Sequence, residues 1–150
     1  MKTWIVLAVW IAVSLSAGFI GSRFPPGEWY QGLEKPSWNP PSWVFGPVWT
    51  LLYILMGIAV WLVWKERGFS AGVYLFIAQL VLNAVWSWLF FGLNRPDLAF
   101  YEILVLWVLI LATMIVFWRV RPAAGALFVP YILWVSFASV LNHTLWKLNG

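Results

Sequence analysis

The sequence predicts an all-α integral membrane protein, a bundle of five transmembrane helices with a proline-rich capping loop between the first two. Its 150 residues are 63% hydrophobic and 9% charged, whereas a soluble domain needs about 25% charged residues to wet its surface. The charges also fall in narrow bands that separate long apolar runs. The alternating segments of about 10 residues that build a transmembrane β-barrel are missing. We therefore expect a single membrane domain over 1–150.

The apolar runs place the helices, because about 20 apolar residues cross a bilayer as a helix. We expect helices at about 3–22, 43–64, 70–92, 97–118 and 122–146. The first run has a second interpretation, since Lys2 and the small residues 14–17 resemble a signal peptide with its cleavage site. Apolar sequence continues past them to Gly21, which favours a retained helix.

The loop over 23–42 differs from the other connections, which are short. It holds five of the nine prolines, so it cannot form one continuous helix. It also holds Trp29, Tyr30 and Trp38, which are too apolar for a solvated linker. We predict a folded cap over one end of the bundle, either a lid over a cavity or an anchor at the membrane interface.

Lysine and arginine are divided almost evenly between the two sides of a five-helix bundle. One side carries five and the other four, so the positive-inside rule assigns no orientation. The net charge of +4 suits anionic lipid headgroups. Nucleic acid is not an expected partner, because no basic cluster exceeds two residues.

Apart from Asp97 at the very start of the fourth span, Glu102 and His143 are the only acidic, basic or histidine side chains inside the spans. Both lie near a helix end, so we expect interfacial structural roles for them. The spans contain no central lysine and no cluster of metal ligands. We therefore expect no metal site, and ion pumping and proteolysis are disfavoured.

Polar, aromatic and small residues recur at helical spacing on four of the spans. The stripes are Ser14, Gly18 and Ser22 on the first span; Trp49, Tyr53 and Gly57 on the second; Gln79, Asn83, Trp86 and Ser87 on the third; and Pro130, Trp134, Ala138 and Asn142 on the fifth. The first stripe is a small-residue ridge suited to close helix packing. Pro130 should kink the fifth span and free the carbonyl of Ala126.

Tryptophan is unusually frequent, with 14 copies in 150 residues. Half of them lie in loops or near helix ends, where the aromatic belt of the membrane interface accounts for them. The others lie deeper, and those on the stripes face the bundle beside Gln79 and Asn83. They form either the aromatic walls of a site for a flat, mostly apolar ligand or a filling of the core and lipid face.

The segment 34–53, EKPSWNPPSWVFGPVWTLLY, closely resembles the signature of the TspO/MBR family, and further matches extend over nearly the whole chain. This family comprises bacterial tryptophan-rich sensory proteins and the mammalian translocator protein. The resemblance implies a five-helix bundle, usually a homodimer, here in a bacterial cell envelope membrane. It also implies porphyrin ligands such as protoporphyrin and haem, with no obligatory cofactor, and in animals cholesterol and benzodiazepine-type drugs.

The resemblance assigns residues to the cavity and its lid by motif position. The ligand-binding positions would be Trp38, Trp43, Trp49, Tyr53, Asn83, Trp134, Ala138 and Asn142. The lid loop would include Arg23, Trp29, Lys35, Pro40 and Pro41. A sterol motif of animal members corresponds to Leu141, His143 and Lys147, with histidine in place of the motif's tyrosine, so this chain departs from it.

Three functions are compatible with these residues. The favoured one is a membrane-embedded binding or sensory protein, in which Trp49 and Trp134 stack on a porphyrin, Asn83 orients it, and Arg23 or Lys35 pairs with its propionates. The second is a light- and oxygen-dependent porphyrin-degrading enzyme, in which the same two indoles are redox partners. The third is a carrier of lipids or sterols.

Overall fold

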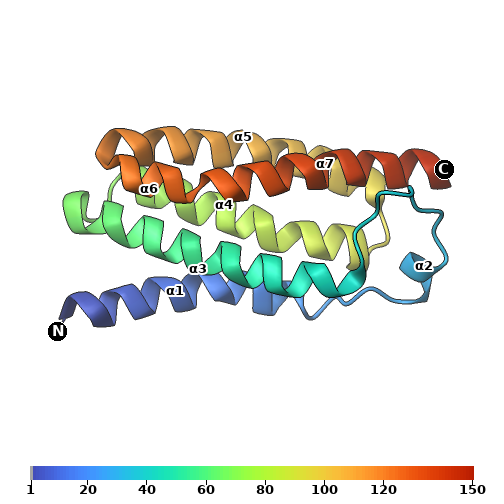
Figure 1. Cartoon of the computed structure of the whole chain (residues 1–150), viewed down its shortest axis with the longest axis horizontal. Coiled ribbons are helices and arrows are strands. Elements are labelled where there is room, and N and C mark those ends of the chain that lie inside the picture. The colour runs from blue at the N-terminus through green and yellow to red at the C-terminus, as the bar shows by residue number, and fades with distance from the viewer. Residues whose placement is uncertain (1) are drawn as a thin grey trace.

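The computed structural model describes residues 2–150, whose regular elements are all helical. The elements are α1 (Lys2–Gly21), α2 (Glu28–Gln31), α3 (Ser42–Arg67), α4 (Ala71–Ser87), the π-helical turn η1 (Trp88–Gly92), α5 (Pro96–Val120), α6 (Pro122–Leu127) and α7 (Val129–Asn149). Their long axes run side by side along the molecule (Figure 1). Helix α1 packs on α3 and α4, and α5 packs on α4, α6 and α7.

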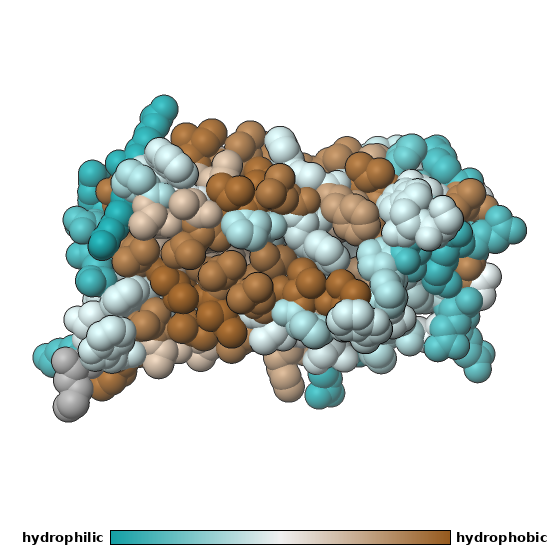
Figure 2. All heavy atoms as spheres, viewed as in Figure 1, coloured by the Kyte–Doolittle hydropathy of each residue, from teal (hydrophilic) through white to brown (hydrophobic). Residues whose placement is uncertain are grey.

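The prediction of five membrane-spanning helices is confirmed. Within residues 2–150, the stretches long and apolar enough to cross a membrane are Lys2–Gly21, Ser42–Arg67, Ala71–Gly92, Pro96–Val120 and Pro122–Asn149. Figure 2 shows apolar side chains over the middle of the visible face and hydrophilic side chains gathered toward its two ends. This distribution is that of a multi-pass membrane protein, because only the ends meet water and headgroups.

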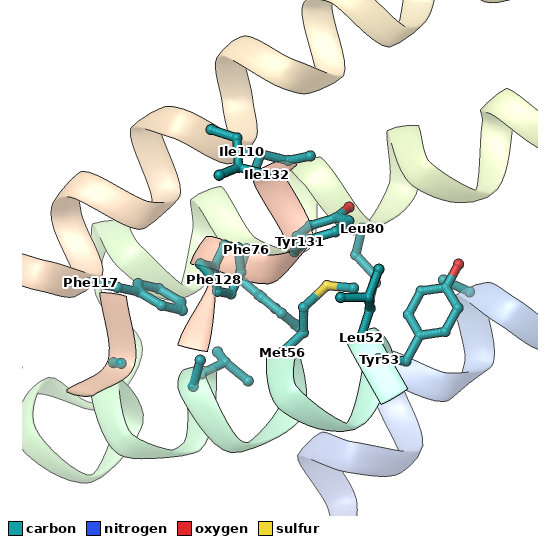
Figure 3. Close-up of a cluster of buried hydrophobic side chains, with 14 of the residues drawn as sticks. Leu52, Tyr53, Met56, Phe76, Leu80, Ile110, Phe117, Phe128, Tyr131 and Ile132 are labelled. Atoms are coloured by element: carbon teal, nitrogen blue, oxygen red, sulfur yellow. The ribbon is translucent and has the colours of Figure 1, made fainter. Parts of the chain in front are cut away.

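The loop between α1 and α3 lies at one end of the bundle. It carries the short helix α2 and reaches the end of α7 near the C-terminus, whereas the N-terminus lies at the opposite end (Figure 1). The core between the helices is aromatic in its middle, where Met56, Phe76, Phe128 and Tyr131 are fully buried (Figure 3). The middle of the bundle is therefore filled by side chains.

Small residues bring α1 and α3 into direct contact. A Cβ atom added to Gly57 would lie 2.7 Å from the Cα of Ile11, so the two backbones touch there. One turn further, the Ser14 hydroxyl donates a hydrogen bond to the carbonyl of Tyr53 at 2.7 Å. The ring of Tyr53 also packs over Gly18, where an added Cβ would lie 2.7 Å from it. The small-residue ridge of α1 thus fixes its distance to α3.

Two helices depart from the predicted geometry. The expected kink at Pro130 takes the form of a one-residue interruption at Phe128: α6 ends at Leu127 and α7 begins at Val129, which puts Pro130 in the first turn of α7. Proline is favoured there because its missing N–H would have no partner in any case. The third span ends in the π-helical turn η1, closed by a hydrogen bond from the Leu93 N–H to the Trp88 carbonyl at 2.8 Å.

Glu102 also differs from expectation. Its predicted place was the interface, but both carboxylate oxygens are buried, and neither has a hydrogen-bond partner among residues 2–150. The side chain starts within the second turn of α5, on a helix whose apolar residues pack against α4 and α7. The Glu102 carboxylate therefore lies among packed side chains and not at the headgroup layer.

The contact between α1 and α3 predicts opposite effects for two Gly→Ala changes in α3. Gly57→Ala should destabilise the protein by about 1–3 kcal/mol, since the new methyl group overlaps the Ile11 backbone. Gly46→Ala adds a methyl group with nothing within 4 Å, and should stabilise the helix by about 0.5–1 kcal/mol. Thermal unfolding in detergent measures both, and equal shifts would contradict the close approach.

Candidate functional site

A cavity of about 650 Å³ lies between the helices beneath the loop. Helices α1, α3, α4, α5 and α7, the turn η1 and the chain after α1 all contribute to its wall. Its volume falls in the range of roughly 300–1,000 Å³ that is usual for small-molecule sites. None of the lining residues that the structure describes is acidic, basic or histidine. The cavity is therefore neutral and mostly apolar.

Tryptophans form three sides of the cavity. Trp49 stacks on Tyr53 with ring centroids 5.6 Å apart and an angle of 29° between the planes. Trp134 projects from α7 and meets Phe45 edge to face at 5.9 Å. A third wall is made by Trp86, which stacks on Phe90 at 5.0 Å. These rings present broad, rigid faces to the enclosed space.

A chain of buried hydrogen bonds joins three helices at the base of the cavity. The Tyr53 hydroxyl donates to Oδ1 of Asn83 at 2.5 Å, and Nδ2 of Asn83 donates to the Tyr131 hydroxyl at 2.8 Å. The Tyr131 hydroxyl donates in turn to Oε1 of Gln79 at 2.7 Å. Because Asn83 uses one of its two amide hydrogens in this chain, it retains the other. Tyr53 and Asn83 line the cavity, while Tyr131 and Gln79 hold them from behind.

A second polar contact ties the helices together closer to the loop. Nε1 of Trp86 donates to Oδ1 of Asn142 at 2.9 Å, and Nδ2 of Asn142 donates to the Pro96 carbonyl at 2.9 Å. The Asn142 side chain therefore links α7 to both α4 and the start of α5. Asn142 lines the cavity, as its stripe predicted, but both ends of its amide are already engaged.

The indole N–H of Trp134, unlike that of Trp86, has no hydrogen-bond acceptor within residues 2–150. The Nε1 atom of Trp134 is buried. A buried donor without a partner costs about 1–3 kcal/mol. The cavity wall thus includes an indole ring whose N–H has no acceptor within the described residues.

The loop after α1 is folded against the end of the bundle. Trp29 packs edge to face on Phe90 at 5.6 Å, and Trp38 packs on Phe137 at 5.8 Å. The Asn149 side chain bonds to both the N–H and the carbonyl of Glu34, at 2.8 and 2.9 Å. Four residues of the segment line the cavity, namely Phe24, Pro25, Pro26 and Tyr30. Of the two interpretations of this loop, its place over the cavity is that of a lid.

The structure brings most of the sequence-assigned ligand residues together. The cavity wall includes Trp49, Tyr53, Asn83, Trp134, Ala138 and Asn142. Trp38 and Trp43 lie outside it: Trp38 packs against Phe137, and Trp43 is 75% exposed at the start of α3.

The assigned lid residues also lie outside the cavity wall. These are Arg23, Trp29, Lys35, Pro40 and Pro41. Lys35 is engaged within the loop, where its Nζ donates to the carbonyl of Tyr30 at 2.8 Å and of Leu33 at 3.3 Å. The exposed Arg23 is the cation that directly follows the cavity-lining end of α1.

Of the three sterol-motif positions, only Leu141 lines the cavity. His143 and Lys147 are exposed. The His143 ring packs against Phe100 at 5.0 Å, and the Lys147 Nζ lies 4.0 Å from the Trp146 ring centroid. These two positions therefore face away from the enclosed space.

Sequence reasoning missed several lining residues. Phe45 and Gly46 precede Trp49 and Thr50 by one turn, so extending the α3 stripe backward would have found them. Phe90 and Phe91 are brought to the cavity by the π-helical turn η1, for which the sequence offers no periodic signal. No group of three His, Asp or Glu side chains in the described chain is placed to hold a metal ion.

Five membrane-spanning helices around a neutral, aromatic cavity closed by a folded loop define a multi-pass membrane protein with an interior small-molecule site as its candidate functional centre. Comparison with known proteins then gives the family. Residues 5–147 match the family model described as TspO/MBR family, and the chain belongs to that family.

Relatives match along most of their length. The chain is 48% identical to tryptophan-rich protein TspO of Chlorobaculum tepidum, covering 99% of this chain and 98% of that protein. It is 42% identical to the translocator protein of Homo sapiens, over 87% of this chain and 82% of that one. It is 38% identical to protein CrtK of Rhodobacter capsulatus, over 96% and 92% respectively.

The hydrogen-bonded chain predicts a large difference between two Tyr→Phe changes. Tyr131→Phe removes a hydroxyl that bonds to both Asn83 and Gln79, and should cost about 1–3 kcal/mol because two buried polar groups lose their partner. Tyr74→Phe alters a ring that is 61% exposed, and should leave stability within about 0.5 kcal/mol. Thermal unfolding in detergent compares them; similar melting temperatures would show that the network contributes nothing.

Proposed function

We propose that this protein is a membrane-embedded binding or sensory protein for porphyrins, such as protoporphyrin and haem. The observation that carries the proposal is the cavity itself, a neutral space of about 650 Å³ with Trp49, Trp86 and Trp134 on its walls. Relatives of this chain are named translocator protein and, in Cereibacter sphaeroides, tryptophan-rich sensory protein. Those names describe those proteins, and they support a sensory or translocating role for this one.

The aromatic walls favour a ligand with a broad π-face. A porphyrin lying between Trp49 and Trp134 gains buried area and also aromatic contacts, each worth about 0.5–1.5 kcal/mol beyond that area. Trp49 is already braced by Tyr53 on one side, so its ring does not have to be ordered when a ligand binds. A preformed wall of this kind lowers the entropic cost of binding.

The polar groups of the cavity offer donors to the ligand. Nε1 of Trp134 has no acceptor within the described chain, and Asn83 retains one amide hydrogen. A bound porphyrin would satisfy them through acceptor atoms, its ring nitrogens or carbonyl-bearing substituents. The lack of charge on the wall means that the ring's carboxylates stay outside, toward the lid and the headgroups.

Arg23 is the better placed of the two cations expected to bind those carboxylates. Lys35 already donates to backbone carbonyls of the loop. Arg23 is exposed and lies between Ser22 and Phe24, both of which line the cavity. Its guanidinium would pair with a propionate at the rim of the site.

Because the indole N–H of Trp134 has no acceptor within the described residues, we expect its Nε1 atom to contribute to the affinity for the porphyrin. Trp134→Phe keeps an aromatic ring but removes the donor, and should weaken protoporphyrin binding about tenfold, the equivalent of one hydrogen bond. Trp43→Phe, at a position that is 75% exposed, is the matched control. Titration followed through porphyrin absorbance measures both. Equal affinities in the two variants would rule out the donor role, and wild-type affinity in Trp49→Ala/Trp134→Phe would reject the cavity as the site.

The placement of the carboxylates predicts a ligand-dependent effect of Arg23. Arg23→Gln should weaken binding of protoporphyrin by about two- to fivefold, as expected for an exposed ion pair, and should leave its dimethyl ester unaffected. Arg67→Gln, at the opposite end of α3 from the lid, serves as the control. Loss of affinity for acid and ester alike would contradict the pairing.

A further inference from the structure

The exposed part of the cavity wall is confined to one side of the bundle. Every lining residue contributed by α4, η1, α5 and α7 is buried or half-buried. The exposed lining residues all belong to α1, to the loop that follows it, where Pro25 and Pro26 are among them, or to the first part of α3. Phe19 on α1 is 66% exposed, and Gly46 and Thr50 on α3 are exposed as well. The wall is therefore open between the end of α1 and the beginning of α3.

This opening lies at the depth of the acyl chains. Trp43, exposed at the start of α3, marks the headgroup level by the usual preference of tryptophan. Gly46 and Thr50 follow it by three and seven residues, which places them about 5 and 10 Å deeper along the helix. The headgroup layer on one side of a bilayer is about 5–7 Å thick. Thr50 is thus beside hydrocarbon, and Gly46 is at its edge.

We propose that a membrane-dissolved apolar ligand enters and leaves the cavity laterally, through a portal between α1 and α3 bounded by Phe19, Ser22, Gly46 and Thr50. The inference rests on the proposed function, since it concerns the route of the ligand that the cavity binds. In this proposal Gly46 does more than line the cavity, because its lack of a side chain keeps the entry route open.

The rim of the portal is suited to an apolar molecule. The Thr50 hydroxyl donates to the carbonyl of Gly46 at 2.8 Å, and the Ser22 hydroxyl donates to the carbonyl of Phe19 at 2.6 Å. Both polar side chains are therefore satisfied within their own helices and offer no free donor to the bilayer. A Cβ added to Gly46 would meet nothing within 4 Å, so the gap beside it is open.

The lid is fastened on the other sides of the cavity. Trp38 packs on Phe137 of α7, and Trp29 packs on Phe90 of η1. The paired hydrogen bonds between Asn149 and Glu34 add a third attachment, at the end of α7. Access from water under the lid would have to break these contacts, whereas the α1–α3 side is open without any movement of the lid.

The test compares the rates of ligand binding in three variants. Gly46→Phe fills the portal, and Gly27→Phe makes the same change in the lid, where an added Cβ also meets nothing within 4 Å. Asn149→Ala releases an attachment of the lid. Each variant and the wild type are reconstituted in lipid vesicles, and protoporphyrin dimethyl ester is added from vesicles that already contain it. Quenching of tryptophan fluorescence reports binding, and none of the changes adds or removes a tryptophan.

The portal predicts that Gly46→Phe lowers the association and dissociation rate constants together, by about tenfold or more, as for binding that has to wait for an opening. Gly27→Phe and Asn149→Ala should match the wild type. Unchanged rates in Gly46→Phe, or faster dissociation with unchanged association, would overturn the portal, because the added ring would then only crowd the bound ligand. Faster association in Asn149→Ala would also overturn it. Absence of binding by the wild type would reject the proposed function itself.

Discussion

Every polar group that this protein places between its helices has to find a partner inside the bundle, because hydrocarbon offers none. The chain from Tyr53 through Asn83 and Tyr131 to Gln79 meets this requirement for three helices at once. Its members fix the rotation of α3, α4 and α7, since each hydrogen bond holds only in one register. The stacking of Trp49 on Tyr53 and the position of Asn83 in the cavity wall depend on that register.

Within the five spans of the described chain, two buried polar side chains have no such partner, and they differ in what surrounds them. Nε1 of Trp134 belongs to a ring that lines a space large enough for a ligand. The carboxylate of Glu102 is equally without a partner in the described chain, but Glu102 does not line the cavity. An unmet donor at a cavity wall is a means of recognition, because a ligand gains the bond that the protein lacks. An unmet carboxyl group between packed helices offers no such site, and it lowers stability unless it is protonated.

The spans could be predicted from the sequence because the charged side chains other than Glu102 are confined to the helix ends and loops, where water and headgroups lie. The cavity-facing stripes could also be predicted, since Trp49 and Tyr53, or Trp134 and Ala138, lie one helical turn apart. The arrangement of the lid could not. Its contacts join residues far apart in the sequence, such as Glu34 and Asn149, and no local pattern encodes them. The π-helical turn η1 could not be predicted for the same reason, since tertiary packing around Phe90 decides between α and π geometry.

The neutral wall of the cavity constrains what any ligand can do there. Selectivity has to come from shape, from stacking area and from acceptors that reach Trp134 and Asn83, because no ion pair is offered inside. A ligand with one apolar face and one charged edge is then oriented by the membrane itself. Its charged edge would lie toward Arg23 and the headgroups, and its apolar part toward Tyr53 and the bundle core. Under the proposed function, the lid and the α1–α3 side would then serve different parts of the same molecule, the lid its polar edge and the α1–α3 side its apolar body.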